Sequence, residues 1–159
     1  MKVLVVCTGN VCRSPMAAEL LRHLLAERGV EGVEVSSAGT ATWDGAPASE
    51  SSYLICLEHG LDLSGHRARQ ITTDLVAGAD LVLGMGESHV ARVEALGGAG
   101  KAHMLGAYAG EPDETAEVTD PFGGDLTEYR ATFERLSTLL DAAVTRLARG
   151  ARDADPGQD

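Results

Sequence analysis

The sequence has no apolar run long enough to cross a membrane, and it is poor in basic residues. Its 159 residues include 13 lysines and arginines against 24 aspartates and glutamates, which gives a formal net charge of −11. A chain this acidic is a poor partner for nucleic acid, so any anion that it binds must be held by local geometry. The N-terminus lacks the charged-then-apolar plan of a signal peptide. We therefore expect a cytoplasmic protein without a membrane partner.

Cysteine is also scarce. Cys7, Cys12 and Cys56 are an odd number without the spacing of a disulfide framework, which favours free thiols. The five histidines lack metal-ligand spacings such as H-E-x-x-H, so we predict no metal. The length fits one domain with a proper core, which we place at residues 1–149. The small, charged segment 150–159 is expected to be a disordered tail.

What the sequence does contain is a strand, a loop and a helix start in direct succession. Residues 3–6 are four apolar residues, three of them β-branched, as is typical of a buried strand in a parallel sheet. Ser14 and Pro15 predict a helix start, because serine is a favoured N-cap and proline a favoured first residue. The loop between them, residues 7–13, contains Gly9, which is free to take unusual dihedral angles.

This loop has the residues of a phosphate site that carries a nucleophile. Backbone N–H groups and the dipole at a helix N-terminus attract an anion, and the guanidinium of Arg13 matches two phosphate oxygens. Cys7, beside both, is expected to react as a thiolate. The alternative is a structural glycine loop with one buried cysteine. The agreement of strand, loop, cap and proline favours phosphoryl transfer to Cys7.

Residues 7–15, Cys-Thr-Gly-Asn-Val-Cys-Arg-Ser-Pro, resemble the C-x-G-N-[IV]-C-R-S-P signature of the low-molecular-weight protein tyrosine phosphatases. The resemblance implies a cofactor-free phosphatase that hydrolyses protein phosphotyrosine through a cysteinyl-phosphate and releases inorganic phosphate. It also implies a three-layer α/β fold: a four-stranded parallel sheet with helices on both faces and the phosphate-binding loop after strand one. It covers about residues 3–147. The substrate-binding residues in the loop are then Thr8, Gly9, Asn10, Val11, Cys12 and Ser14.

The rest of the chain independently alternates between strand-like and helix-like segments, which predicts an α/β fold with a parallel sheet. Further strands are expected at 33–36, 80–83 and 102–105, and helices at 15–28, 50–59, 71–76 and 87–96. From Leu126 to Leu147, apolar residues recur at alternating spacings of three and four, which predicts a long amphipathic helix. Asp125 and Glu128 resemble a capping box at its start.

A thiolate that attacks phosphorus needs a general acid to protonate the leaving group. Asp120, in the sequence Asp-Pro-Phe-Gly-Gly, is the best candidate, and the family carries its acid in a D-P-[YF] motif at this place. A turn or helix-start role for Asp120 is the alternative. By the same resemblance, Phe122 belongs to the substrate pocket and Trp43 to its aromatic rim. Trp43 could instead be a loop residue that packs on the domain.

Two polar residues are candidates for holding the loop in shape. Asn10 can do so through its amide, and Ser14 can give its hydroxyl to the thiolate, although Ser14 could be only a helix cap. In the family, a serine and a histidine hold this asparagine, and the resemblance assigns these roles to Ser37 and His66. The alternative for His66 is a loop histidine with its hydrogen bonds satisfied.

The sequence combines features of the tyrosine phosphatases with features of the related protein-arginine phosphatases. Val11 is apolar, as in the tyrosine enzymes, whereas the related protein-arginine phosphatases tend to have threonine there. Phe122 and Gly123 replace the two tyrosines of a common D-P-Y-Y sequence and resemble the arginine enzymes. A third departure is Met85-Gly86-Glu87-Ser88-His89, where many members have M-D-x-x-N. A protein-arginine phosphatase is therefore the alternative to a tyrosine phosphatase.

Two further alternatives fit the sequence less well. A thiol-linked arsenate reductase needs two more relay cysteines, but only Cys56 lies outside the loop. A phosphate-binding module without turnover would not need Cys7, Arg13 and Asp120 together. The two loop cysteines also predict redox sensitivity, because oxidation of Cys7 next to Cys12 can be trapped as a disulfide. Alternatively, Cys12 simply packs under the loop.

Overall fold

The computed structural model describes the backbone of residues 1–154 and the side chains of residues 1–150. Four parallel strands form one sheet in the order β2-β1-β3-β4. Their bounds are Lys2–Cys7 for β1, Glu34–Gly39 for β2, Leu81–Gly84 for β3 and Ala102–Met104 for β4. The nucleophile candidate thus ends a strand with a neighbour on each side. The predicted sheet is confirmed, with β2 at an edge.

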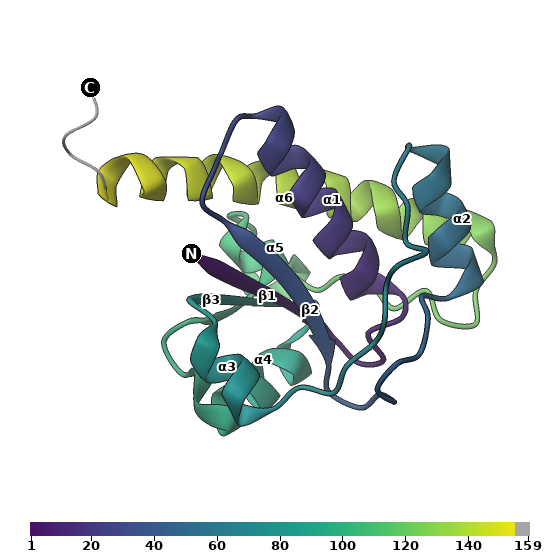
Figure 1. The fold of residues 1–159 in the computed structure, drawn as a ribbon, viewed down its shortest axis with the longest axis horizontal. Coiled ribbons are helices and arrows are strands. Elements are labelled where there is room, and N and C mark those ends of the chain that lie inside the picture. The colour runs from purple at the N-terminus through teal and green to yellow at the C-terminus, as the bar shows by residue number, and fades with distance from the viewer. Residues whose placement is uncertain (155–159) are drawn as a thin grey trace.

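Helices cover both faces of this sheet (Figure 1). The chain order gives α1 Arg13–Glu27, α2 Glu50–Glu58, α3 Thr73–Gly78, α4 Glu87–Val93, a π-helical turn Glu94–Gly98, α5 Leu105–Tyr108, a 3-10 turn Asp113–Thr115 and α6 Leu126–Ala154. Helices α1 and α6 lie on one side of the sheet, and α3 and α4 lie on the other. The three-layer α/β architecture expected from the sequence is therefore confirmed. No helix in the described part of the chain is long and apolar enough to span a bilayer.

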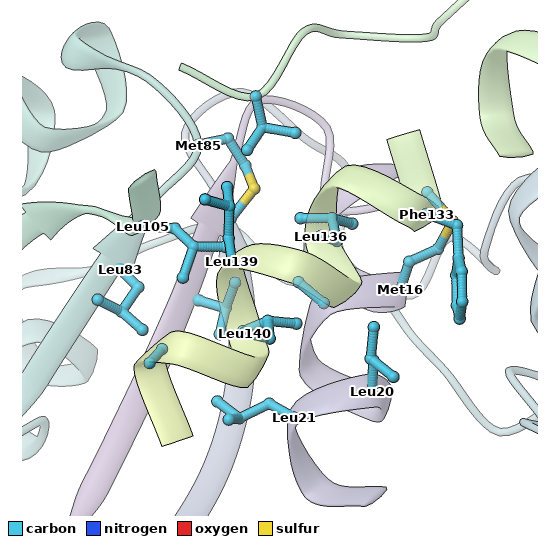
Figure 2. Packing of buried hydrophobic residues seen from close by; sticks show 14 of the residues in the cluster. Met16, Leu20, Leu21, Leu83, Met85, Leu105, Phe133, Leu136, Leu139 and Leu140 are labelled. Carbon is cyan, nitrogen blue, oxygen red and sulfur yellow. The ribbon is translucent and has the colours of Figure 1, made fainter. Parts of the chain in front are cut away.

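Strand β1 is buried on both faces, which explains its unbroken apolar run. Val3 and Val5 belong to the core beneath α1 and α6, and Leu4 and Val6 belong to the smaller core beneath α3 and α4. Figure 2 shows the larger core, with α1 and α6 packed over the sheet. Its labelled side chains include Met16, Leu20 and Leu21 of α1, Leu83 of β3, and Leu136, Leu139 and Leu140 of α6. This packing fixes the start of α1 relative to the end of β1.

The start of α1 differs from the prediction. The helix begins at Arg13 with Cys12 at the N-cap, and no side chain caps it. Ser14 is therefore not the N-cap, because its hydroxyl is engaged by the thiol of Cys7 and the amide of Asn10 instead. Pro15 still fits, since the N–H groups of a first helical turn have no partner within the helix.

The last helix also extends further than expected. Helix α6 continues to Ala154, past residue 150, where the sequence predicted the tail to begin. Arginine and alanine, both favourable in helices, recur in this stretch. The remainder of the predicted tail, 155–159, lies outside the described residues. At the other end, Asp125 caps the helix by accepting the N–H of Glu128 at 3.0 Å.

Candidate active site

The loop between β1 and α1 is built around a buried asparagine. Asn10 has a φ of 52°, in the left-handed region that asparagine tolerates better than most residues. Its amide nitrogen donates to the hydroxyls of Ser14 and Ser37 at 2.8 and 2.9 Å, and its Oδ1 accepts the N–H of Arg69 at 3.0 Å. These hydrogen bonds offset the backbone strain and fix the turn of the loop.

His66 supports the same asparagine through the backbone. Its Nε2 lies 2.7 Å from the carbonyl oxygen of Asn10, and because a carbonyl only accepts, Nε2 carries the proton. Burial lowers the pKa of His66, so the ring is neutral at pH 7. Asn10, Ser14, Ser37 and His66 thus meet in one network, as the family resemblance implied.

Cys7 lies at the end of this network. Its Sγ is 2.9 Å from Oγ of Ser14. Since that oxygen already accepts an N–H from Asn10, the hydroxyl hydrogen of Ser14 is available to the sulfur. A hydroxyl donor at this place stabilises a sulfur anion. The buried amide therefore acts on the nucleophile through one intervening serine.

Arg13 connects the loop to the segment that carries the candidate acid. Its Nη1 donates to the carbonyl oxygen of Val118 at 2.9 Å, and its Nη2 lies 3.5 Å from Oδ2 of Asp120. The Nε of Arg13 is buried and has no hydrogen-bond partner in the described part of the chain. A buried donor left unpaired costs about 1–3 kcal/mol. An oxyanion bound beside Cys7 would supply the missing acceptor.

Asp120 itself is placed at the surface of the site. Its side chain is 48% exposed, and its Oδ1 accepts the N–H of Phe122 at 3.0 Å. The carboxylate is therefore open to a substrate while its other oxygen faces Arg13. Phe122 is 78% exposed, so its ring is available to a ligand rather than packed on the protein.

The segment after β2 lies along the catalytic loop. Thr40 N donates to the carbonyl oxygen of Cys7 and Ala41 N to that of Thr8, both at 3.0 Å, and the hydroxyl of Thr42 donates to the carbonyl of Gly9. Gly39 permits this approach, because a Cβ there would lie 2.6 Å from the carbonyl oxygen of Thr8. Trp43 follows at once and is 85% exposed, so it does not pack on the domain as the alternative interpretation required.

The other end of the loop is held from α2 and α6. The carbonyl of half-buried Val11 accepts the N–H of Ser49 at 2.8 Å. The Sγ of Cys12 lies 3.3 Å from the hydroxyl of Tyr129 and 3.6 Å from that of Ser49. Burial, with the neighbouring Cys12, raises the pKa of Tyr129 to about 12. In the sequence, Tyr129 falls within the apolar pattern between Leu126 and Leu147, which gives no sign of this contact.

All three cysteines are free and buried in the structure. Burial, with Glu19 nearby, raises the pKa of Cys56 to about 12, which makes this thiol unreactive at neutral pH. The thiol of Cys12 contacts the hydroxyls of Ser49 and Tyr129. The disulfide between Cys7 and Cys12 stays a prediction. No cluster of three or more potential metal ligands occurs among the described residues.

Like Tyr129, His89 contacts the loop without having been predicted to do so. His89 is a buried residue in the first turn of α4, and its Nε2 lies 2.9 Å from the hydroxyl of Thr8. The available signal was the departure from M-D-x-x-N, because His89 stands where that pattern has asparagine. A single changed position in a helix gave no reason to place its ring against the loop.

Comparison with known proteins identifies the family. Residues 2–153 match the model of the low molecular weight phosphotyrosine protein phosphatases. The chain is 38% identical over 147 residues to the probable low molecular weight protein-tyrosine-phosphatase EpsP of Ralstonia nicotianae, covering 91% of this chain and 94% of that protein. It is 36% identical over 148 residues to a protein-arginine-phosphatase of Geobacillus stearothermophilus, covering 92% and 95%.

A solved structure agrees with this fold. A cysteine-to-serine mutant of the YwlE arginine phosphatase, with a phosphorylated active-site serine, superposes with a TM-score of 0.89 at 31% identity, over 96% of this chain and 99% of that one. Together with the loop geometry, these matches show that the chain belongs to the low molecular weight phosphotyrosine protein phosphatase family.

Proposed function

We propose that this protein is a phosphatase that hydrolyses phosphotyrosine in proteins through a cysteinyl-phosphate intermediate on Cys7. The observation that carries the proposal is the buried guanidinium of Arg13, whose Nε has no partner among the described residues, on the same loop as Cys7, whose Sγ lies 2.9 Å from Oγ of Ser14. Arginine offers the fork of donors that two phosphoryl oxygens require. The arrangement thus combines a nucleophile with a site for the group that it attacks.

The residues suggest a two-step reaction. The thiolate of Cys7 attacks phosphorus, and the bond between phosphorus and the leaving oxygen breaks while Asp120 donates its proton to that oxygen. Asp120, now a carboxylate, then takes a proton from a water molecule that attacks the cysteinyl-phosphate. Inorganic phosphate leaves, and both Cys7 and Asp120 return to their starting forms. Arg13 compensates the phosphoryl charge in both steps.

The substrate is inferred from three side chains that the family resemblance assigns to substrate binding. Val11 offers an apolar surface, and the rings of Trp43 and Phe122 are exposed, so an aromatic leaving group finds suitable partners. The alternative substrate is phosphoarginine, which the sequence Phe122-Gly123 favours by resemblance. The two are separated by the rates at which phosphotyrosine and phosphoarginine peptides of one sequence are hydrolysed. A faster phosphoarginine reaction would reverse the substrate assignment.

The expected partners and location of the protein complete the proposed function. Phosphorylated proteins are the substrates and inorganic phosphate the product, and the net charge of −11 argues against nucleic acid as a partner. A cytoplasmic location, predicted from the sequence, completes this assignment. The proposed reaction uses Cys7, Asp120, Arg13 and a water molecule, and it requires no metal or other cofactor.

Val11→Thr is expected to shift the preference toward phosphoarginine. Threonine has nearly the same shape as valine but adds a hydroxyl that can accept a hydrogen bond from a guanidinium. We expect the ratio of kcat/KM for phosphoarginine to that for phosphotyrosine to rise about tenfold. Val11→Ile, which changes size without polarity, serves as the control and should leave the ratio near the wild-type value. An unchanged ratio in Val11→Thr would show that position 11 does not select the substrate.

Asp120→Ala is expected to slow poor leaving groups most. Phenolate needs protonation more than p-nitrophenolate, which is already a stable anion. We expect kcat/KM, which reports only the step that releases the leaving group, to fall about 100-fold for phenyl phosphate and clearly less for p-nitrophenyl phosphate. Asp113→Ala removes an exposed carboxylate from the same connecting segment and is the control. Equal losses on both substrates would exclude Asp120 as the general acid.

A further inference from the structure

His89 is held in one tautomer by the backbone of its own helix start. It is only 4% exposed, and its Nδ1 lies 3.0 Å from the backbone nitrogen of Gly86. A backbone N–H can only donate, so Nδ1 is the acceptor and the proton of the neutral ring lies on Nε2. Burial, and secondarily the nearby Arg13, lowers the pKa of His89, which keeps the ring neutral at pH 7.

This tautomer determines which way the hydroxyl of Thr8 points. The Nε2–H of His89 donates to the hydroxyl oxygen of Thr8 at 2.9 Å. The hydroxyl hydrogen of Thr8 must then point away from His89. Thr8 directly follows Cys7 and is exposed, so this hydrogen is available to a ligand on the open side of the loop.

Thr8 is also held between two neighbours of β1 in the sheet. On the β2 side, its carbonyl oxygen accepts the N–H of Ala41 at 3.0 Å. On the β3 side, His89 holds its side chain from α4, the helix that follows β3. Backbone and side chain of the residue next to the nucleophile are therefore fixed from opposite directions.

We propose that His89 is a positioning residue for phosphoryl transfer, which orients the hydroxyl of Thr8 as a hydrogen-bond donor to the phosphoryl group bound at Cys7. This inference rests on the proposed function. The arrangement parallels the one at the nucleophile. A buried donor fixes a hydroxyl oxygen in both cases. Asn10 does so for Ser14, whose hydroxyl lies against Sγ of Cys7, and His89 does so for Thr8, whose hydroxyl hydrogen is left for the phosphoryl group.

The test is a double-mutant cycle on the full chain with p-nitrophenyl phosphate as substrate. His89→Phe keeps a ring but removes both nitrogens, and Thr8→Val keeps the shape but removes the hydroxyl. We expect each variant to lower kcat/KM about tenfold, the effect of one hydrogen bond. The double variant should be no slower than either single variant, because all three lack the same interaction.

Two more variants separate positioning from folding. His89→Gln can present an N–H at about the place of Nε2, so it should recover most of the wild-type kcat/KM. His103→Phe makes the same replacement of an imidazole by a phenyl ring in β4, where His103 contacts Tyr108 instead of the loop, and should keep full activity. If His89→Phe does not fold, as judged by thermal unfolding, Thr8→Val at its exposed position must still show the loss.

The outcomes distinguish this inference from the proposed function. A wild-type protein without turnover would overturn the proposed function and the inference with it. An active wild type with losses that multiply in the double variant would overturn the role of His89 alone. So would a His89→Gln variant as slow as His89→Phe, or a Thr8→Val variant with full activity.

Discussion

Replacement of Cys7 by serine is expected to abolish turnover while leaving the fold intact. A serine hydroxyl fits beside Ser14, which already contacts the sulfur at 2.9 Å, but it is not ionised at neutral pH. We expect kcat for p-nitrophenyl phosphate to fall by a factor of about 10⁴ or more, as for other enzymes that lose a covalent nucleophile. Orthophosphate should still bind, since Arg13 and the loop backbone remain.

The measurements are steady-state kinetics, orthophosphate binding and intact-protein mass spectrometry. Slow attack by the new hydroxyl would leave one phosphoryl group on residue 7, because an alkyl phosphate hydrolyses far more slowly than a cysteinyl-phosphate. Cys56→Ser is the control, since Cys56 belongs to α2 and burial makes its thiol unreactive by raising its pKa to about 12, so the change should not affect catalysis. Turnover within tenfold of wild type in Cys7→Ser would contradict a covalent intermediate on Cys7.

Replacement of Arg13 by lysine should be nearly as damaging, although it keeps the positive charge. Lysine presents one ammonium group, which cannot provide two parallel hydrogen bonds to phosphoryl oxygens or contact Val118 and Asp120 as the guanidinium does. We expect kcat/KM to fall about 1,000-fold, the scale for removing donors that stabilise a transition state.

The matched control is Arg22→Lys on the same helix. Arg22 is exposed and contacts Glu19 and the carbonyl of Val35, outside the catalytic loop. This variant should keep wild-type kinetics. A similar loss in both variants would indicate that α1 tolerates no lysine, and a small loss in Arg13→Lys would show that charge alone suffices at the site.

The strand–loop–helix arrangement of residues 2–27 was predictable because its signals are local. An apolar strand, a glycine, an arginine and a proline follow one another within a few residues, and each has a direct structural meaning. The prediction of Ser14 as the N-cap was wrong because the preference of serine for this position reflects only contacts within the helix. Ser14 finds better partners in Cys7 and Asn10, which the strand and the loop bring to it.

Residues distant in the sequence were predictable only where the family motif included them. Ser37 and His66 reach Asn10 through the fold, and no periodicity in their own segments indicates that contact. His89 and Tyr129 were missed for the same reason, because each occupies a helical position that looks like part of an apolar face. The short helix α5, four residues long, offers too few turns for any periodicity.

The residues proposed for the reaction and those proposed for substrate selection lie in different parts of the fold. The proposed nucleophile is the last residue of the inner strand β1, whereas Trp43 follows the edge strand β2 and Phe122 lies just before α6. Both rings are exposed and carry no packing, so substitutions there cost little folding stability. Under the proposed function, a lineage with this fold can therefore acquire a new substrate by replacing these two exposed residues one at a time, while the residues proposed for the reaction are inherited unaltered.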